Sequence, residues 1–102
     1  MIEFVEPWSL IEGDAKTAAE AELIKEIGDQ HPLFGRTAKA IGRRIDRDDF
    51  LFLLDSKTTE CAVVHLVWQG RKESDPRWPH TEIYKSLNDW KVLRMTVDRD
   101  NY

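Results

Sequence analysis

The sequence predicts an α+β fold in which a three-stranded antiparallel meander packs against two helices. The segments 49–54 and 60–69 have the composition of buried strands, and a polar turn at 55–59 separates them. An apolar stripe with four-residue spacing at 15–27 predicts an amphipathic helix before them. With 102 residues, the chain is expected to form one domain, 1–102.

The N-terminal helix is predicted over residues 15–27. Ala19, Leu23 and Ile27 recur at the spacing of one helix face. Asp14 is the expected N-cap because its side chain can accept a hydrogen bond from an unpaired N–H of the first turn. Gly28 is expected to end the helix in the left-handed conformation.

Residues 36–45 fit two interpretations. As a helix they place a basic stripe opposite Ala38, Ile41 and Ile45, and as a strand they alternate Lys39 and Ile41 with smaller residues. Gly42 would cost a helix interior about 1 kcal/mol relative to alanine. Residues 46–49 also suit a hairpin turn into the next strand, so the strand is favoured.

The segment 60–69 is predicted to be the central strand. Cys61, Val63 and His65 point to one face, and the residues between them, together with Trp68, point to the other. Both faces are largely apolar, so both are expected to be covered.

The C-terminal third is predicted to contain a loop and a second helix. Two prolines and a charge cluster indicate a loop at 70–80. Thr81 can cap a helix over about 82–92, in which Ile83, Leu87 and Trp90 share a face. Residues 98–102 are expected to fray.

Charge is segregated along the chain, although its net value is only −4. Residues 1–30 hold eight acidic and two basic residues, including three glutamates, at 20, 22 and 26, that lie off the apolar stripe. A basic segment follows, and it could hold phosphates. Asp46, Asp48 and Asp49 lie beside it and offset its field, so nucleic-acid binding is not favoured. The basic residues are Arg36, Lys39, Arg43, Arg44 and Arg47.

Several classes of protein are disfavoured. Cys61 is the single cysteine, so a scaffold held by internal disulfides is excluded. The longest apolar run, 50–54, is far shorter than the roughly 20 residues that span a bilayer. The N-terminus is acidic where a signal peptide is basic. A cytoplasmic protein without membrane contact is expected.

No catalytic residue, metal site or cofactor is predicted. Cys61 and His65 lie four residues apart on one strand, roughly 13 Å, which is too far to share a metal or a proton. The sequence has no glycine-rich phosphate loop and no histidine pair at metal-binding spacing. His65 is interpreted as a structural histidine bonded to a backbone carbonyl or to a carboxylate such as Asp48 or Asp49, in preference to a base at the edge of a pocket.

The aromatic residues are the main candidates for interaction. Trp78 lies between two prolines and next to Arg77, and tryptophan and arginine are enriched at interface hot spots. Alternatively, Trp78 covers the edge of the core. The interaction candidates are therefore His65, Trp68, Arg77 and Trp78.

Five segments carry a resemblance to a known group of proteins: residues 31–33, 48–52, 62–68 and 76–79, and the region of Trp90 and Asp98. With these segments, residues 31–102 resemble a family of small uncharacterised bacterial α+β proteins. The resemblance implies the strand at 36–45 and transfers no catalytic residue. Small proteins of this kind include partners that neutralise toxins.

The function expected first is therefore a non-enzymatic bacterial interaction protein, with an immunity-type inhibitor as one form and a homodimer as another. A small-ligand or enzymatic pocket built from His65, Trp68, Arg77 and Trp78 is the alternative. Weak nucleic-acid binding through the basic segment is the third hypothesis.

Overall fold

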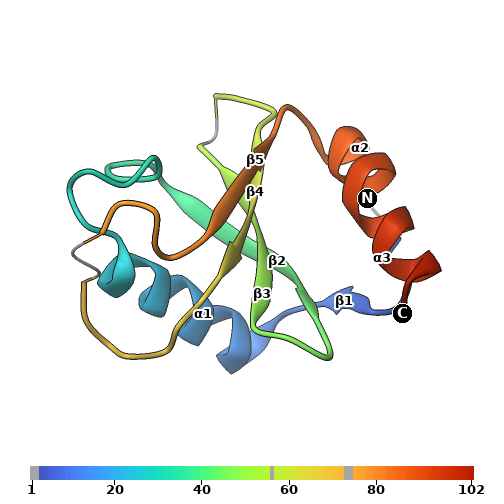
Figure 1. Ribbon diagram of the computed structural model, residues 1–102, viewed down its shortest axis with the longest axis horizontal. Helices are drawn as coiled ribbons and strands as arrows, with labels where there is room; N and C mark the ends of the chain where they lie inside the picture. Colours follow the sequence, from blue (N-terminus) through green and yellow to red (C-terminus); the bar gives the residue numbers. More distant parts are fainter. Residues whose placement is uncertain (1–2, 56, 73–74) are drawn as a thin grey trace.

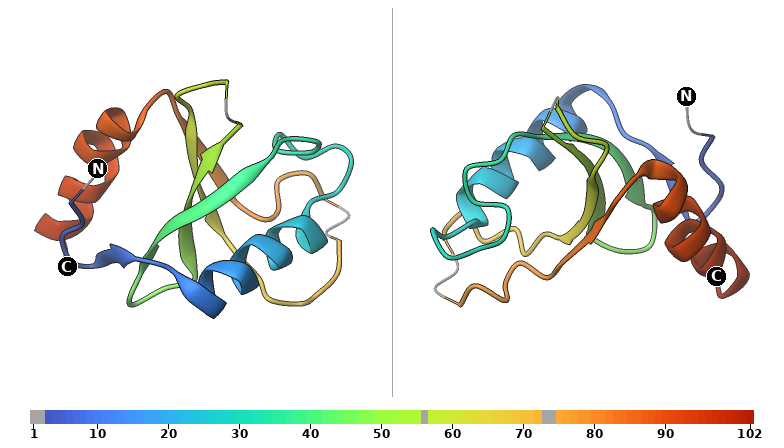
Figure 2. Two further views of the ribbon diagram at one scale, coloured as in Figure 1. Left: turned by 180° about the vertical axis from the view of Figure 1, so that it is seen from behind. Right: turned by 90° about the horizontal axis from the view of Figure 1, so that it is seen from above.

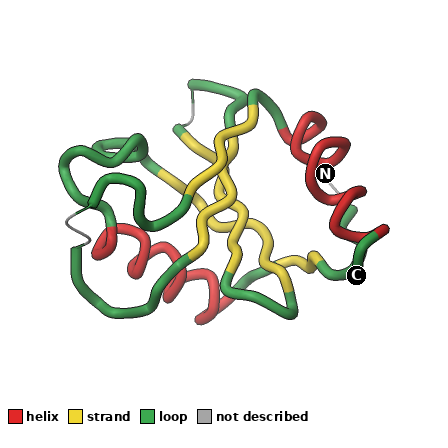
Figure 3. The backbone as a smooth tube through the Cα atoms, viewed as in Figure 1, coloured by secondary structure: helices red, strands yellow, loops and turns green. Residues whose placement is uncertain are grey.

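The computed structural model describes residues 3–55, 57–72 and 75–102 and shows an α+β fold (Figure 1). Residues 1–2, 56 and 73–74 lie outside the described residues. Parts of three expected segments fall on them: the N-terminus, the turn at 55–59 and the loop at 70–80. One antiparallel sheet has the strand order β1-β2-β3-β4-β5, and Figure 3 draws the strands in yellow. Its strands are β1 (Trp8–Leu10), β2 (Ala38–Arg44), β3 (Asp49–Leu54), β4 (Cys61–His65) and β5 (Thr81–Tyr84).

Two helical segments pack on the sheet. The first is α1 (Gly13–Glu26). The second is continuous and consists of α2 (Leu87–Trp90), the π-helical turn η1 (Lys91–Met95) and α3 (Thr96–Asp100). We call this second segment the C-terminal helix. Seen from above, the sheet lies between α1 and the C-terminal helix (Figure 2).

The predicted meander corresponds to β2, β3 and β4, so the strand interpretation of residues 36–45 is confirmed. The expected number of three strands is wrong, because β1 and β5 extend the sheet at its two edges. The strand β1 has only three residues, which are too few to show the alternation of apolar and polar residues that predicts a strand.

The predicted helix at 82–92 is wrong at its start. Residues Thr81–Tyr84 pair with β4 instead, because the backbone groups along the open edge of β4 need hydrogen-bond partners. The helix begins at Leu87, and Ser86 is its N-cap, with the Asp89 N–H donating to the Ser86 Oγ at 3.1 Å. It continues to Asp100, so the residues expected to fray from 98 onward are mostly helical.

The apolar stripe of the N-terminal helix is confirmed, since Ala19, Leu23 and Ile27 are buried. Both expected ends are wrong in detail. Glu12 is the N-cap and makes no side-chain cap bond, while Asp14 lies within the first turn. The cap at the other end is Ile27 in an extended conformation, and Gly28 is not among the described glycines with positive φ.

The central strand is shorter than predicted, because β4 ends at His65 and not near residue 69. The Glu26 carboxylate accepts hydrogen bonds from the N–H groups of Val67 (2.9 Å) and Trp68 (2.7 Å). Glu22 accepts one from Gly70 at 3.0 Å. These two glutamates, expected off the apolar stripe, are buried on α1 and turn the chain away from the sheet.

Both faces of the sheet are covered, as predicted for the central strand. Alternate residues of β3 and β4 face α1, among them Phe52 and Val64. The residues between them, such as Leu51 and Val63, pack with Trp90 beneath the C-terminal helix. Within the described residues, no helix has both the length and the apolar character needed to cross a membrane.

We expect the protein to lose stability as the pH rises from about 4.5 to about 7. Burial first, and then the hydrogen bond with Glu22 and its charge, raise the pKa of Glu26 from 4.5 to about 7. A protonated Glu26 therefore contributes its full stabilisation below the unfolded pKa, and this contribution is lost as the pH rises through the folded pKa. The substitution Glu26→Gln, which keeps an acceptor but cannot ionise, should remove this part of the pH dependence.

Urea unfolding at several pH values measures the effect. Glu12→Gln is the control, because Glu12 is exposed at the start of the same helix and undergoes the same change of charge. Equal pH slopes for wild type and Glu26→Gln would contradict the assignment.

Candidate functional site

A row of polar side chains crosses β2, β3 and β4 at one end of the sheet and continues to the residue before β5. Asp49 on β3 lies directly opposite His65 on β4. Arg44 follows Arg43, the partner of Phe50, and so lies beside Asp49. The His65 N–H donates to the His80 carbonyl at 2.9 Å, which extends the row to His80. We call Arg44, Asp49, His65 and His80 the charged row.

The C-terminal helix covers the apolar residues of this sheet face and leaves part of the charged row open. Cys61 and Val63, which precede His65 on the same face, are buried, whereas 47 % of the His65 side chain is exposed. A cleft of about 690 Å³ opens at this point. Its walls include Arg47, Trp78, Tyr84 and Leu93 together with the charged row.

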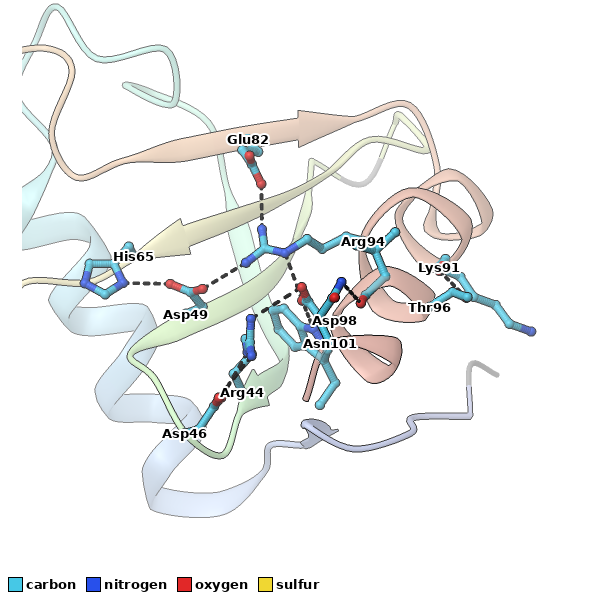
Figure 4. Close-up of polar contacts among 12 residues, drawn as sticks. Arg44, Asp46, Asp49, His65, Glu82, Lys91, Arg94, Thr96, Asp98 and Asn101 are labelled. Carbon is cyan, nitrogen blue, oxygen red and sulfur yellow. Dashed lines mark hydrogen bonds and ion pairs between the residues drawn. The ribbon is translucent and has the colours of Figure 1, made fainter.

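His65 and Asp49 form a hydrogen-bonded pair at the cleft (Figure 4). The His65 Nδ1 lies 2.7 Å from the Asp49 Oδ1, and the Asp49 side chain is only 7 % exposed. A carboxylate accepts and does not donate, so the Nδ1 of His65 carries the hydrogen of this bond. The Nε2 is then left for a ligand, and it makes no hydrogen bond to a described residue.

Arg94 binds the Asp49 carboxylate on the side opposite His65 (Figure 4). Its Nη2 donates to the Asp49 Oδ2 at 2.9 Å, its Nη1 to the Glu82 Oε1 at 2.6 Å, and its Nε to the Asp98 Oδ2 at 2.9 Å. Burial alone would lower the pKa of Arg94, but Asp98, Tyr84, Glu82 and Asp49 together raise it above its ordinary value. The guanidinium therefore stays charged and links the C-terminal helix to β3 and β5.

Arg94 lies in the π-helical turn η1 of the C-terminal helix. The Thr96 N–H reaches the Lys91 carbonyl, five residues back, and the Thr96 hydroxyl donates to the same oxygen at 3.0 Å. Such turns are frequent at functional sites. Here the turn presents Arg94 and Leu93 to the cleft.

Asp98 links Arg94 to the two other strands, β1 and β2. It accepts a hydrogen bond from the Trp8 Nε1–H at 2.7 Å and pairs with the Arg44 Nη1 at 3.4 Å. Arg44 also donates twice to Asp46, at 3.0 Å each. Every charged group buried behind the cleft therefore has an opposite charge beside it, as buried charges require.

The structure brings together two of the four interaction candidates. His65 and Trp78 both line the cleft. Trp68 packs edge-on against Phe50 on the α1 side, with ring centroids 5.8 Å apart. Arg77 lies outside the cleft walls, where it pairs with Asp75 and keeps an 82 % exposed side chain.

The basic residues at 36–47 do not form a single patch. Arg36 pairs with Asp55 and Glu60, and Arg43 lies over the ring of Phe50 at 5.5 Å from its centroid. Lys39 lies in a second hollow, of about 850 Å³, beside the start of the C-terminal helix. Arg44 and Arg47 are the members that line the cleft of His65.

Cys61 and His65 do not meet. The Cys61 thiol is buried, donates to the Ser86 carbonyl at 3.5 Å, and has its pKa raised to about 11 by burial and by Asp89. Within residues 3–55, 57–72 and 75–102, no group of three histidine, cysteine or acidic side chains is arranged to hold a metal ion.

The sequence offered Asp49 as one possible partner of His65, beside Asp48 and a backbone carbonyl, and gave no role to Arg94, Glu82 or Asp98. Arg94 and Asp98 are four residues apart, a spacing that indicates a pair on one helix turn. No sequence signal places that pair against Asp49, because Asp49 and Arg94 are 45 residues apart in the chain.

Comparisons with protein-family models, with curated proteins and with solved structures found no match to the chain. The resemblance to small bacterial α+β proteins therefore stays a prediction. The arguments about function that follow depend on the geometry of the cleft.

Removing Arg94 should destabilise the fold strongly. Arg94→Met would leave Asp49, Glu82 and Asp98 without their shared cation, and breaking a buried ion pair in this way costs about 3–5 kcal/mol. Arg99→Met is the control on the same helix, because Arg99 pairs with Asp100 at the surface and should contribute less than about 0.5 kcal/mol. Urea unfolding measures both, and similar losses for the two variants would contradict the role of Arg94.

Proposed function

We propose that the cleft binds a small molecule and that His65 acts in it as a general base. The observation that carries this proposal is the half-exposed imidazole of His65, whose Nδ1 is bonded to the buried carboxylate of Asp49. A purely structural histidine uses both ring nitrogens inside the protein, as His31 does with the Leu33 N–H and the Pro79 carbonyl. His65 uses one nitrogen and offers the other to the cleft.

The roles of the residues follow from this geometry. The His65 Nε2 accepts a proton from water or from a hydroxyl group of the ligand. The imidazolium that forms is stabilised by the Asp49 carboxylate at 2.7 Å, which also holds the ring in one orientation. Arg94 lines the cleft, but it is a positioning residue, since each of its three nitrogens already donates to a carboxylate of the protein, one of them that of Asp49.

The cleft walls support proton transfer more than covalent catalysis. Serine, threonine and cysteine are absent from the described residues that line the cleft. Trp78, Tyr84 and Leu93 supply apolar surface for the body of a ligand, as small-molecule sites commonly do. A nucleophile activated by His65 would therefore be water or part of the ligand.

His65→Gln should lower the rate at which the protein hydrolyses p-nitrophenyl acetate by at least about tenfold, because a positioned base contributes about 10²–10⁴-fold. Asp49→Asn should give a rate between those of wild type and His65→Gln. Arg71→Gln is the control for a substitution by glutamine, since Arg71 is exposed, lies outside the cleft walls and leaves the Asp49–His65 pair intact. Circular dichroism confirms folding, and a His65→Gln rate equal to that of wild type would refute the role of His65 as a base.

Protein binding, the function expected first, is a second candidate. Three apolar residues of the C-terminal helix, Val92, Leu93 and Val97, are 58 %, 63 % and 48 % exposed. Three exposed apolar side chains on one helix favour contact with another protein or with a second copy of the chain.

If the helix mediates self-association, Val97→Asp should shift the protein to the monomer in sedimentation-velocity experiments at micromolar concentration. Lys91→Asp, an acidic substitution at an exposed basic position of the same helix, is the control for added charge. A wild-type protein that sediments as a monomer at every concentration would contradict the homodimer.

A further inference from the structure

Two glutamate side chains of α1 hold the chain segment 67–70, which follows β4, in its place. The Glu26 carboxyl group accepts hydrogen bonds from the first two N–H groups of the segment at 2.9 and 2.7 Å. The Glu22 carboxyl group accepts one from the last N–H group at 3.0 Å. Within the described residues, these three N–H groups have no other hydrogen-bond partner. The backbone of the segment is therefore held by the two glutamates.

The segment has a backbone conformation that needs such support. The φ angles of Trp68 and Gly70 are +61° and +68°. Glycine adopts this left-handed conformation freely, whereas a bulky residue such as tryptophan adopts it only where its surroundings hold it. The Trp68 indole is partly exposed and contacts Phe50 edge-on. The hydrogen bond from the Trp68 N–H to Glu26 is thus the contact that keeps its backbone in this conformation.

Glu22 and Glu26 share one proton. Both are buried on α1, and their carboxyl groups are hydrogen-bonded to each other. A carboxylate cannot donate a hydrogen bond, so this bond requires a proton on one of the two groups. The bond lowers the pKa of Glu22, whereas burial and Glu22 raise the pKa of Glu26 to about 7. The proton therefore belongs to Glu26, and its loss would leave two negative charges side by side away from water.

The charged groups of the neighbouring elements do not compensate a second negative charge. Neither glutamate forms an ion pair with a described residue. On α1, Lys25 is exposed and lowers the pKa of Glu22 only. On β2, the Arg43 guanidinium lies over the Phe50 ring. After α1, both ring nitrogens of His31 are bonded to backbone groups. The residues of β3 and β4 in this core are apolar, and the segment 67–70 has no titratable side chain.

We propose that the Glu22–Glu26 pair is a pH-dependent latch, which holds the segment 67–70 against α1 while it keeps its proton and releases it when both carboxyl groups are ionised. The closed form binds this proton more tightly than the released form, so the closed form is favoured at low pH. It is lost as the pH rises through the folded-state pKa of Glu26. The release is local, because the hydrogen bonds of the sheet do not involve this segment. The latch does not depend on the function proposed for the cleft.

Hydrogen exchange of the backbone amides, measured by NMR on the wild-type protein at pH 5.5 and 8.5, tests the latch. After division by the intrinsic exchange rates, the protection of the Val67 and Trp68 amides should fall at least about tenfold between the two pH values. The protection of the Phe52 amide, in the middle of β3, should change less than about twofold. Constant protection at Val67 and Trp68 would overturn the latch, and so would an equal loss at Phe52, because the whole fold would then open together.

Two substitutions fix the latch in its closed form. In Glu26→Gln and in Glu22→Gln, the amide group can donate to the remaining carboxylate at every pH, as the protonated acid does in the wild type. In each variant, the protection of Val67 and Trp68 should therefore differ less than about twofold between pH 5.5 and 8.5. Glu12→Gln, the exposed control on the N-terminal side of α1, should keep the wild-type response. A tenfold fall that persists in both glutamine variants of the pair would refute the shared proton as its cause.

Discussion

The guanidinium of Arg94 carries three ion pairs in a place that is largely closed to water, and the positions of the cleft residues depend on it. Its side chain is 17 % exposed, and those of Asp49 and Asp98 are 7 % and 11 % exposed. None of these charges could be buried alone, because the lost hydration would exceed any packing gain. The C-terminal helix, β3 and β5 therefore come together at one cation.

The same interaction explains why His65 differs from the apolar residues before it on β4. The helix covers Cys61 and Val63 with Trp90 and Met95, and beyond them the covering element is the charged end of Arg94. A charged group needs a polar neighbour, so the next position of the strand face holds the Asp49–His65 pair and not another valine. The cleft is the place where apolar packing gives way to charge pairing.

The meander and the N-terminal helix could be predicted because each depends on a local pattern long enough to detect. The buried roles of Glu22 and Glu26 could not, because their partners are backbone N–H groups of residues 67–70, which no side-chain pattern reveals. The start of the C-terminal helix was mistaken for a similar reason. Ile83 fits both a helix and a strand periodicity, and the open edge of β4 decided between them.

By itself, the sequence determined the fold class, three of the five strands and the apolar face of α1, and it offered an acid as one of the possible partners of His65. Only the tertiary structure decided that His65 faces an open cleft, that Arg77 lies outside it, and that Arg94 holds Asp49. The physical reason is that periodicity shows which residues are buried, whereas a site depends on contacts between residues far apart in the chain. Strand register and the length of sheet that a helix covers decide those contacts.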